Sequence, residues 1–151
     1  MKAAVYYETG APDVFRYEDV PDPECPANGV LVEVKAVSIE GGDVLNRAGG
    51  LMAGKPHVVG YQCAGTVREV GGSVRHLAPG DRVVAVMPHG SHAALAAVPE
   101  ATAWKIPDGV DLEAAACVPI AVGTADDCLF EFGRIQAGEA ATLNLILKAD
   151  V

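Results

Sequence analysis

The sequence contains no apolar run of about 18 residues, the length that a membrane-crossing helix needs. Its first residues, MKAAVYYETG, also lack the hydrophobic region of a signal peptide. Positive charge is scarce, because 11 Lys and Arg stand against 20 Asp and Glu, which gives a net charge of -9. We therefore expect a soluble, cytoplasmic protein that binds neither membranes nor nucleic acids, since anionic phosphates would be repelled.

Cysteines are few, and no two of them form a C-x-x-C pair. This spacing favours free thiols, buried or half-buried, over a disulfide framework or a zinc-thiolate site. The four positions are Cys25, Cys63, Cys117 and Cys128.

Histidines also lack the surroundings of a metal site. His89 and His92 have the H-x-x-H spacing, but no Cys, Asp or Glu lies near them in the sequence to complete a ligand set. We expect them to lie in an exposed loop. His57 and His76 have no ligand-spaced partner, and ordinary turn or surface positions are expected for both.

Short strands with alternating apolar residues fill the first two-thirds of the chain. In VLVEVKAV, Val30, Val32 and Val34 fall on one face, which predicts a half-buried antiparallel strand. Other runs are bounded by Gly, Pro or Asp, and such a series of short strands predicts a small barrel or sandwich. These runs cover residues 3–7, 64–70, 82–86, 93–98 and 103–106.

The periodicity changes near residue 110. Asp111 is a suitable N-cap for a helix over 112–118, which Pro119 should break because proline lacks a backbone donor. A second helix is expected over about 122–132, with Gly133 at its end. Alternating leucines at 143–147 then allow one more strand.

Several landmarks occur in an order that resembles the catalytic domain of the medium-chain dehydrogenase/reductase superfamily. They are the run GYQCAGTVREVG, the turn GDRV and the segment IPDGVDLEAAA, and the resemblance extends over about residues 1–139. It implies a GroES-like fold, mainly β with short helices, in which a distorted antiparallel barrel carries the substrate cleft. We expect a GroES-like substrate domain over 1–118, followed over 119–151 by a linking helix and either a stub or a returning strand.

The residues at the zinc-binding positions of this superfamily are changed. In its zinc members a cysteine stands where this sequence has Glu40, the motif G-H-E stands at Gly60-Tyr61-Gln62, and a further cysteine falls near Ile120. A phenol, an amide and an isoleucine do not replace thiolate and imidazole ligands. The cysteine-rich structural zinc lobe is also missing after GDRV. The resemblance is therefore to the zinc-independent branch of quinone oxidoreductases and 2-enoyl reductases, and no metal is expected.

Enzymes of that branch pass hydride from a nicotinamide, usually NADPH, to a quinone or another conjugated carbonyl. Without a metal, the oxyanion that forms must be stabilised by hydrogen-bond donors and then protonated. Tyr61 is the first candidate for that catalytic role, and a cleft-lining or core position is the alternative. Gln62 and Asn46 are expected to bind substrate through their amides.

Two carboxylates on the bend SIEGGDVLNRAG are further catalytic candidates. Glu40 and Asp43 are spaced so that one could donate a proton while the other stays ionised, although Asp43 also suits a turn-forming role. The resemblance supports Asp43 as a cleft residue. It also places Thr124 at the nicotinamide end of the cofactor, a role that is compatible with capping a helix.

The glycine-rich turn that cradles a dinucleotide is not found. Residues 140–151 contain no glycine, and a βαβ unit needs about 30 residues. We therefore expect the Rossmann domain to be missing and the chain to be inactive by itself, as a truncated or domain-excised reductase. The alternative is a non-enzymatic GroES-like module for binding or assembly, which could form homo-oligomers through the C-terminal strand.

Overall fold

The computed structural model of the chain describes residues 1–134. They divide between a unit over Met1–Ile120 and a second unit that begins at Ala121. All the described strands lie in the first unit, and short helices complete it. The mainly β class expected from the sequence is confirmed. The predicted division at residue 118 stays a prediction.

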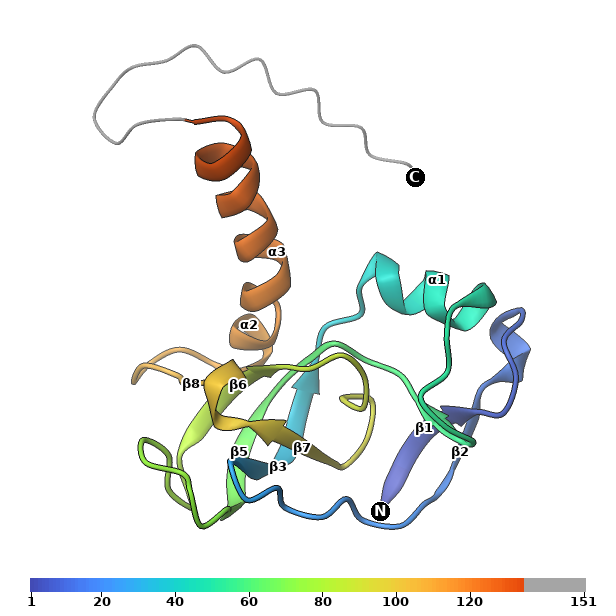
Figure 1. Ribbon diagram of the computed structural model, residues 1–151, viewed down its shortest axis with the longest axis horizontal. Coiled ribbons are helices and arrows are strands. Elements are labelled where there is room, and N and C mark those ends of the chain that lie inside the picture. Colours follow the sequence, from blue (N-terminus) through green and yellow to red (C-terminus); the bar gives the residue numbers. More distant parts are fainter. Residues whose placement is uncertain (135–151) are drawn as a thin grey trace. The chain divides into compact units, whose positions relative to one another are not determined.

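Two antiparallel sheets form the first unit (Figure 1). The smaller sheet has the order β2-β1-β4, and an isolated bridge from Ala3 to Ala93 connects it to the segment before β7. The larger sheet has the order β7-β3-β5-β6-β8. The strands are β1 (Lys2–Tyr6), β2 (Arg16–Asp19), β3 (Gly29–Val37), β4 (His57–Val58), β5 (Gln62–Val70), β6 (Arg82–Val86), β7 (Leu95–Pro99) and β8 (Ala103–Lys105).

The larger sheet packs its alternating apolar residues into the main core. Val30, Val32 and Val83 are fully buried there, as period-two alternation predicts. Leu31, however, is also buried at 5% exposure, so β3 begins with both faces covered instead of half-buried. Register shifts along the β3–β5 pair, typical of β-bulges, curl the sheet toward a half-barrel.

The segment expected to be a bend is in fact the helix α1 (Gly41–Gly49). Its first turn is closed by Asp43, whose Oδ2 accepts the backbone N–H of Glu40 at 2.8 Å. Asp43 and Arg47, four residues apart, form its buried face. The sequence did not predict this helix because two glycines stand at its start, and glycine lowers helix propensity.

Two further helices follow β8. Asp111 caps α2 (Leu112–Ala116) as predicted, accepting the Ala114 N–H at 2.9 Å. Pro119 does not simply separate two helices, because α3 (Val118–Asp126) already includes it in the first turn, where a missing N–H is harmless. The remaining elements are a π-helix (Asp127–Phe132), capped by Gly133 as expected, and the short 3-10 turns Pro12–Val14 and Glu100–Thr102. The leucine-rich strand expected at 143–147 lies outside the described residues.

Free thiols are confirmed at all four cysteines, but their exposure differs from the expectation. Cys63 is fully buried, and burial raises the pKa of its thiol to about 12. Cys25 is half-buried, whereas Cys117 and Cys128 are exposed. Burial therefore protects Cys63 from oxidation and alkylation, while the last two remain accessible.

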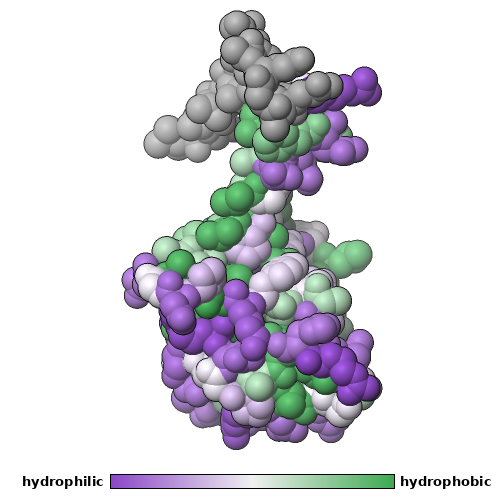
Figure 2. Space-filling view, turned by 90° about the vertical axis from the view of Figure 1, so that its left-hand side faces the viewer, coloured by the Kyte–Doolittle hydropathy of each residue, from purple (hydrophilic) through white to green (hydrophobic). Residues whose placement is uncertain are grey.

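The surface is largely polar on the face of the first unit that Figure 2 shows, where hydrophobic residues form separate small patches. No helix among residues 1–134 has the length and apolar character to cross a bilayer.

Candidate functional site

The candidate site lies where the chain enters β5 beside α1. Gly60, shortly before β5, has a φ of +115°, a backbone conformation that residues other than glycine rarely adopt. A Cβ atom at Gly60 would lie 2.0 Å from Ser91 Oγ, so the close packing of this loop also requires glycine. The turn at Gly60 brings the next two residues, Tyr61 and Gln62, against the first turns of α1.

Tyr61 lies along one face of α1. Its hydroxyl oxygen accepts a hydrogen bond from Asn46 Nδ2. Its ring covers Gly42, where a Cβ atom would come within 2.7 Å of Tyr61 Cε2. Tyr61 is only half-buried. Because its oxygen accepts the hydrogen bond from Asn46, its own O–H remains free to donate. The fold therefore presents a phenol proton at this surface.

Gln62 is fully buried and connects three parts of the first unit. Its Nε2 donates to Glu40 Oε1, and its Oε1 accepts the backbone N–H of Ile120 at 3.1 Å. Glu40 Oε1 also accepts from Ser38 Oγ at 2.8 Å. Gln62 thus holds the N-cap of α1 and the start of α3 together, while its expected contact with substrate stays a prediction.

Asp43, also on α1, is buried with 4% exposure. Besides capping α1, its Oδ2 lies 3.8 Å from His92 Nε2, which is too long for a hydrogen bond. Burial lowers the pKa of His92, and the neighbouring Asp43 opposes that shift. Asp43 Oδ1 and His92 Nε2 are both buried with no hydrogen-bond partner among the described residues.

The approach of His92 to Asp43 has no local signal in the sequence. The H-x-x-H spacing raised the possibility that His89 and His92 share a metal, but they have different neighbours: His92 approaches Asp43, whereas the exposed His89 lies beside His57, with ring centroids 5.6 Å apart. The expected exposed loop is therefore wrong for His92, which is largely buried. His57 is also buried, on β4, and is not the surface residue that was expected.

The residues at the zinc positions do not fit a zinc ion. Glu40 offers a carboxylate already bonded to Gln62 and Ser38, Tyr61 offers a phenol, and Ile120 offers no ligand atom. Within residues 1–134 no cluster of three or more His, Cys, Asp or Glu side chains suits a metal. Independence from zinc nevertheless stays a proposal.

Residues 1–134 do not contain the unit that binds the pyrophosphate of a dinucleotide in the Rossmann manner. All strand pairs in residues 1–134 are antiparallel, so this part of the chain has no βαβ unit with a glycine-rich turn for the pyrophosphate. Thr124, expected at the nicotinamide, is exposed on α3 in the second unit. Its role stays a prediction.

Comparison with known proteins agrees with this fold. The family model "Alcohol dehydrogenase GroES-like domain" matches residues 26–108. Human sorbitol dehydrogenase is 45% identical over 76 residues, which cover 48% of this chain and 21% of that enzyme. The chloroplastic NADPH-dependent alkenal/one oxidoreductase of Arabidopsis thaliana is 35% identical over 142 residues, covering 85% of this chain and 37% of the relative.

A solved structure gives the same result. Escherichia coli quinone oxidoreductase, crystallised with NADPH, superposes with a TM-score of 0.83 at 25% identity, over 87% of this chain and 41% of that chain. The chain thus spans less than half the length of each of these three proteins.

The protein belongs to the alcohol dehydrogenase GroES-like domain family. The predicted membership of the medium-chain dehydrogenase/reductase superfamily, the resemblance to its quinone oxidoreductases and the GroES-like fold are therefore confirmed.

Proposed function

We propose that this chain forms the acceptor-binding site of an NADPH-dependent quinone or enone oxidoreductase that works without catalytic zinc. The observation that carries the proposal is the hydrogen bond from Asn46 to the Tyr61 hydroxyl, because it leaves the phenol proton free for a substrate oxygen. The names of the Arabidopsis and E. coli proteins support the substrate class and the cofactor. A cytoplasmic location belongs to the same proposal and is supported by the four free cysteines.

Tyr61 is the catalytic residue in this proposal. When hydride is added to a conjugated acceptor, negative charge develops on the carbonyl oxygen. A Tyr61 O–H donated to that oxygen stabilises the charge and then supplies the proton that completes the reduction. Asn46 donates to the Tyr61 oxygen, so it stabilises the phenolate that remains after transfer and keeps the ring in place.

Glu40 and Asp43 act through position in the proposed reaction. Glu40 accepts a hydrogen bond from Gln62, the residue that follows Tyr61 in the sequence. Asp43 closes the first turn of α1, the helix that also carries Asn46. Their direct participation in proton transfer stays a prediction. NADPH, when bound, supplies the hydride, although residues 1–134 include no βαβ site for its pyrophosphate.

The oxyanion-binding step can be tested on the chain itself with 4-nitrophenol, whose phenolate is coloured. We expect added protein to raise the ionised fraction of the probe near its pKa, because Tyr61 donates to the phenolate oxygen. Tyr61→Phe should abolish the rise. Tyr17→Phe, which removes the hydroxyl of a tyrosine that is 74% exposed, should leave it unchanged. A bound probe that is more protonated than the free probe, or an unchanged rise in Tyr61→Phe, would contradict the proposal.

The non-enzymatic alternative is not favoured by any feature of residues 1–134. Its proposed interface, the leucine-rich strand at 143–147, lies outside them.

A further inference from the structure

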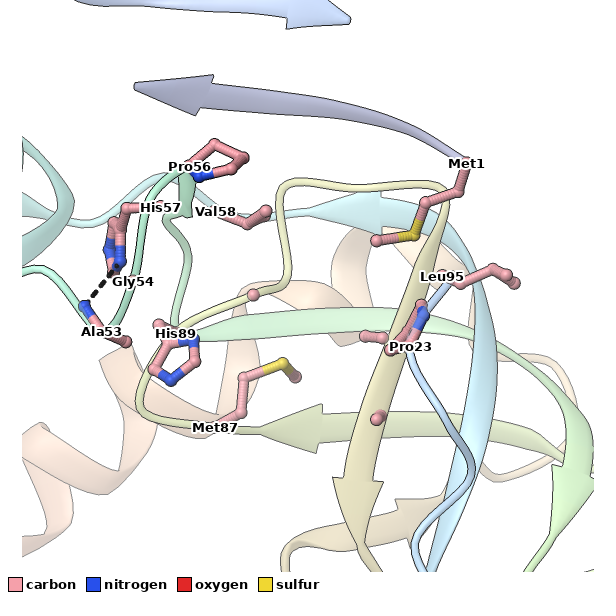
Figure 3. A pocket seen from close by; sticks show the side chains of 13 residues that line it. Met1, Pro23, Ala53, Gly54, Pro56, His57, Val58, Met87, His89 and Leu95 are labelled. Carbon is pink, nitrogen blue, oxygen red and sulfur yellow. Dashed lines mark hydrogen bonds between the residues drawn. The ribbon is translucent and has the colours of Figure 1, made fainter. Parts of the chain in front are cut away.

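A pocket of about 320 Å³, which Tyr61 does not line, lies between β4, the segment that follows β6 and the beginning of β7 (Figure 3). Its wall is mostly apolar and includes Met1, Pro56, Met87 and Leu95. None of the residues at the Tyr61 site lines it. The polar side chains in the wall are two histidines, His57 and His89.

His57 presents a hydrogen-bond donor that the protein leaves unused. The residue is 3% exposed, and its Nδ1 accepts the backbone N–H of Ala53 at 3.1 Å, a contact drawn in Figure 3. Since Nδ1 accepts, the proton of the neutral imidazole is on Nε2. Burial lowers the pKa of His57, and the nearby His89 lowers it further, so this neutral form prevails near pH 7.

The Nε2–H group of His57 is buried and has no partner among the described residues. A buried donor without an acceptor is unfavourable, and such groups in folded proteins call for an explanation. The other unpaired atoms of this region, such as Tyr6 Oη, belong to residues that do not line the pocket. His57 therefore combines an unsatisfied donor with a position in a pocket wall.

The same geometry argues against a metal ion as the occupant. A histidine that binds a metal normally donates its second ring N–H to an acceptor. Here the second nitrogen of His57 faces the N–H of Ala53, which is a donor. The site is therefore suited to a hydrogen-bond acceptor and not to a cation.

We propose that this pocket is a second binding site, which takes a small, largely apolar ketone whose carbonyl oxygen accepts a hydrogen bond from His57 Nε2–H. His89 controls access. It is exposed, its ring lies next to that of His57, and in Figure 3 it lies between His57 and Met87. A change of its side-chain rotamer opens a path to Nε2, while Met87 and Leu95 contact the apolar part of the ligand. This inference does not depend on the function proposed for Tyr61.

Acetophenone is a suitable probe because it is apolar apart from one carbonyl oxygen, and ethylbenzene is its match without that oxygen. In the chain labelled with ¹⁵N at histidine, acetophenone should shift the Nε2 and Hε2 resonances of His57. Its affinity should exceed that of ethylbenzene by up to about tenfold, the value of one hydrogen bond. Ethylbenzene should leave those resonances near their free positions.

Variants test whether binding of the probes depends on His57. His57→Phe keeps a ring against Tyr6, whose ring centroid lies 5.0 Å away, and should bind both probes with the lower affinity of ethylbenzene. His76→Ala, at an exposed position outside the pocket, should bind acetophenone as the unchanged chain does. Equal affinities for the two probes, a bound acetophenone that leaves His57 unshifted, or no binding at all would overturn the proposal. If His57→Phe fails to fold, comparing the affinities of the two probes for the unchanged chain still tests the proposal.

Discussion

Gly60→Ala is expected to destabilise the protein by about 3–5 kcal/mol. Backbone strain at a φ of +115° costs an L-residue about 1–3 kcal/mol, and forcing a methyl group into filled space costs a similar amount. The new Cβ would lie 2.0 Å from Ser91 Oγ and 2.9 Å from the backbone nitrogen of His92. Because small domains are stable by only about 5–15 kcal/mol, urea denaturation should show a much lower midpoint.

Gly49→Ala is the matched control for this substitution. Gly49 ends α1, its φ is not in the left-handed region, and nothing lies within 4 Å of the Cβ that it would gain. Alanine there should leave stability unchanged or raise it by up to about 1 kcal/mol. Equal midpoints for the two variants would show that the loop before Tyr61 is not packed as described.

Gln62→Glu is expected to cost about 3 kcal/mol at pH 7, a loss that acid partly reverses. The substitution replaces the Nε2 donor by a second carboxylate beside Glu40, in a fully buried position. Two neighbouring carboxylates resist ionisation together, so the pKa of one is raised in the folded state above its unfolded value of about 4.3. The folded protein then binds more protons than the unfolded chain, and its stability falls as the pH rises.

The corresponding measurement is urea denaturation at several pH values between about 5 and 7.5. The difference in the free energy of unfolding between Gln62→Glu and the unchanged chain should shrink toward pH 5, where a shared proton restores the hydrogen bond to Glu40. Gln62→Leu should be destabilised without that recovery, because it removes the donor but adds no charge. A variant Gln62→Glu that is fully stable at pH 7 would refute the buried link between β5 and α1.

The sequence predicted the strands of the larger sheet well because their apolar residues alternate against one core, as at Val30 and Val32. It missed β2 and β4, whose few residues pair only through β1 and carry little pattern of their own. The sequence also failed to predict α1. The buried face of this helix consists of Asp43 and Arg47, and charged residues do not produce the apolar periodicity by which an amphipathic helix is recognised.

The sequence nominated residues for the candidate site but could not predict their contacts. Tyr61 and Gln62 were identified by their positions in a family motif, which specifies a place in the fold. The structure adds that Gln62 is used inside the protein and that the Tyr61 hydroxyl accepts from Asn46. The burial of His92 and His57 was not predicted, because it depends on the return of the chain after β6. That long-range contact has no local sequence signal.

The central claim is that a phenol proton, and not a zinc ion, stabilises the substrate oxyanion. The most direct test fuses residues 1–134 to the part of E. coli quinone oxidoreductase that this chain does not match, and follows NADPH oxidation by duroquinone. Duroquinone is chosen because its ring is fully methylated and does not add readily to the exposed Cys117 and Cys128. We predict turnover that a zinc chelator leaves unchanged and that Tyr61→Phe lowers by about 100-fold, while Tyr17→Phe retains it. A fusion protein that binds NADPH but needs zinc for turnover, fails to reduce duroquinone, or is unaffected by Tyr61→Phe would contradict the account.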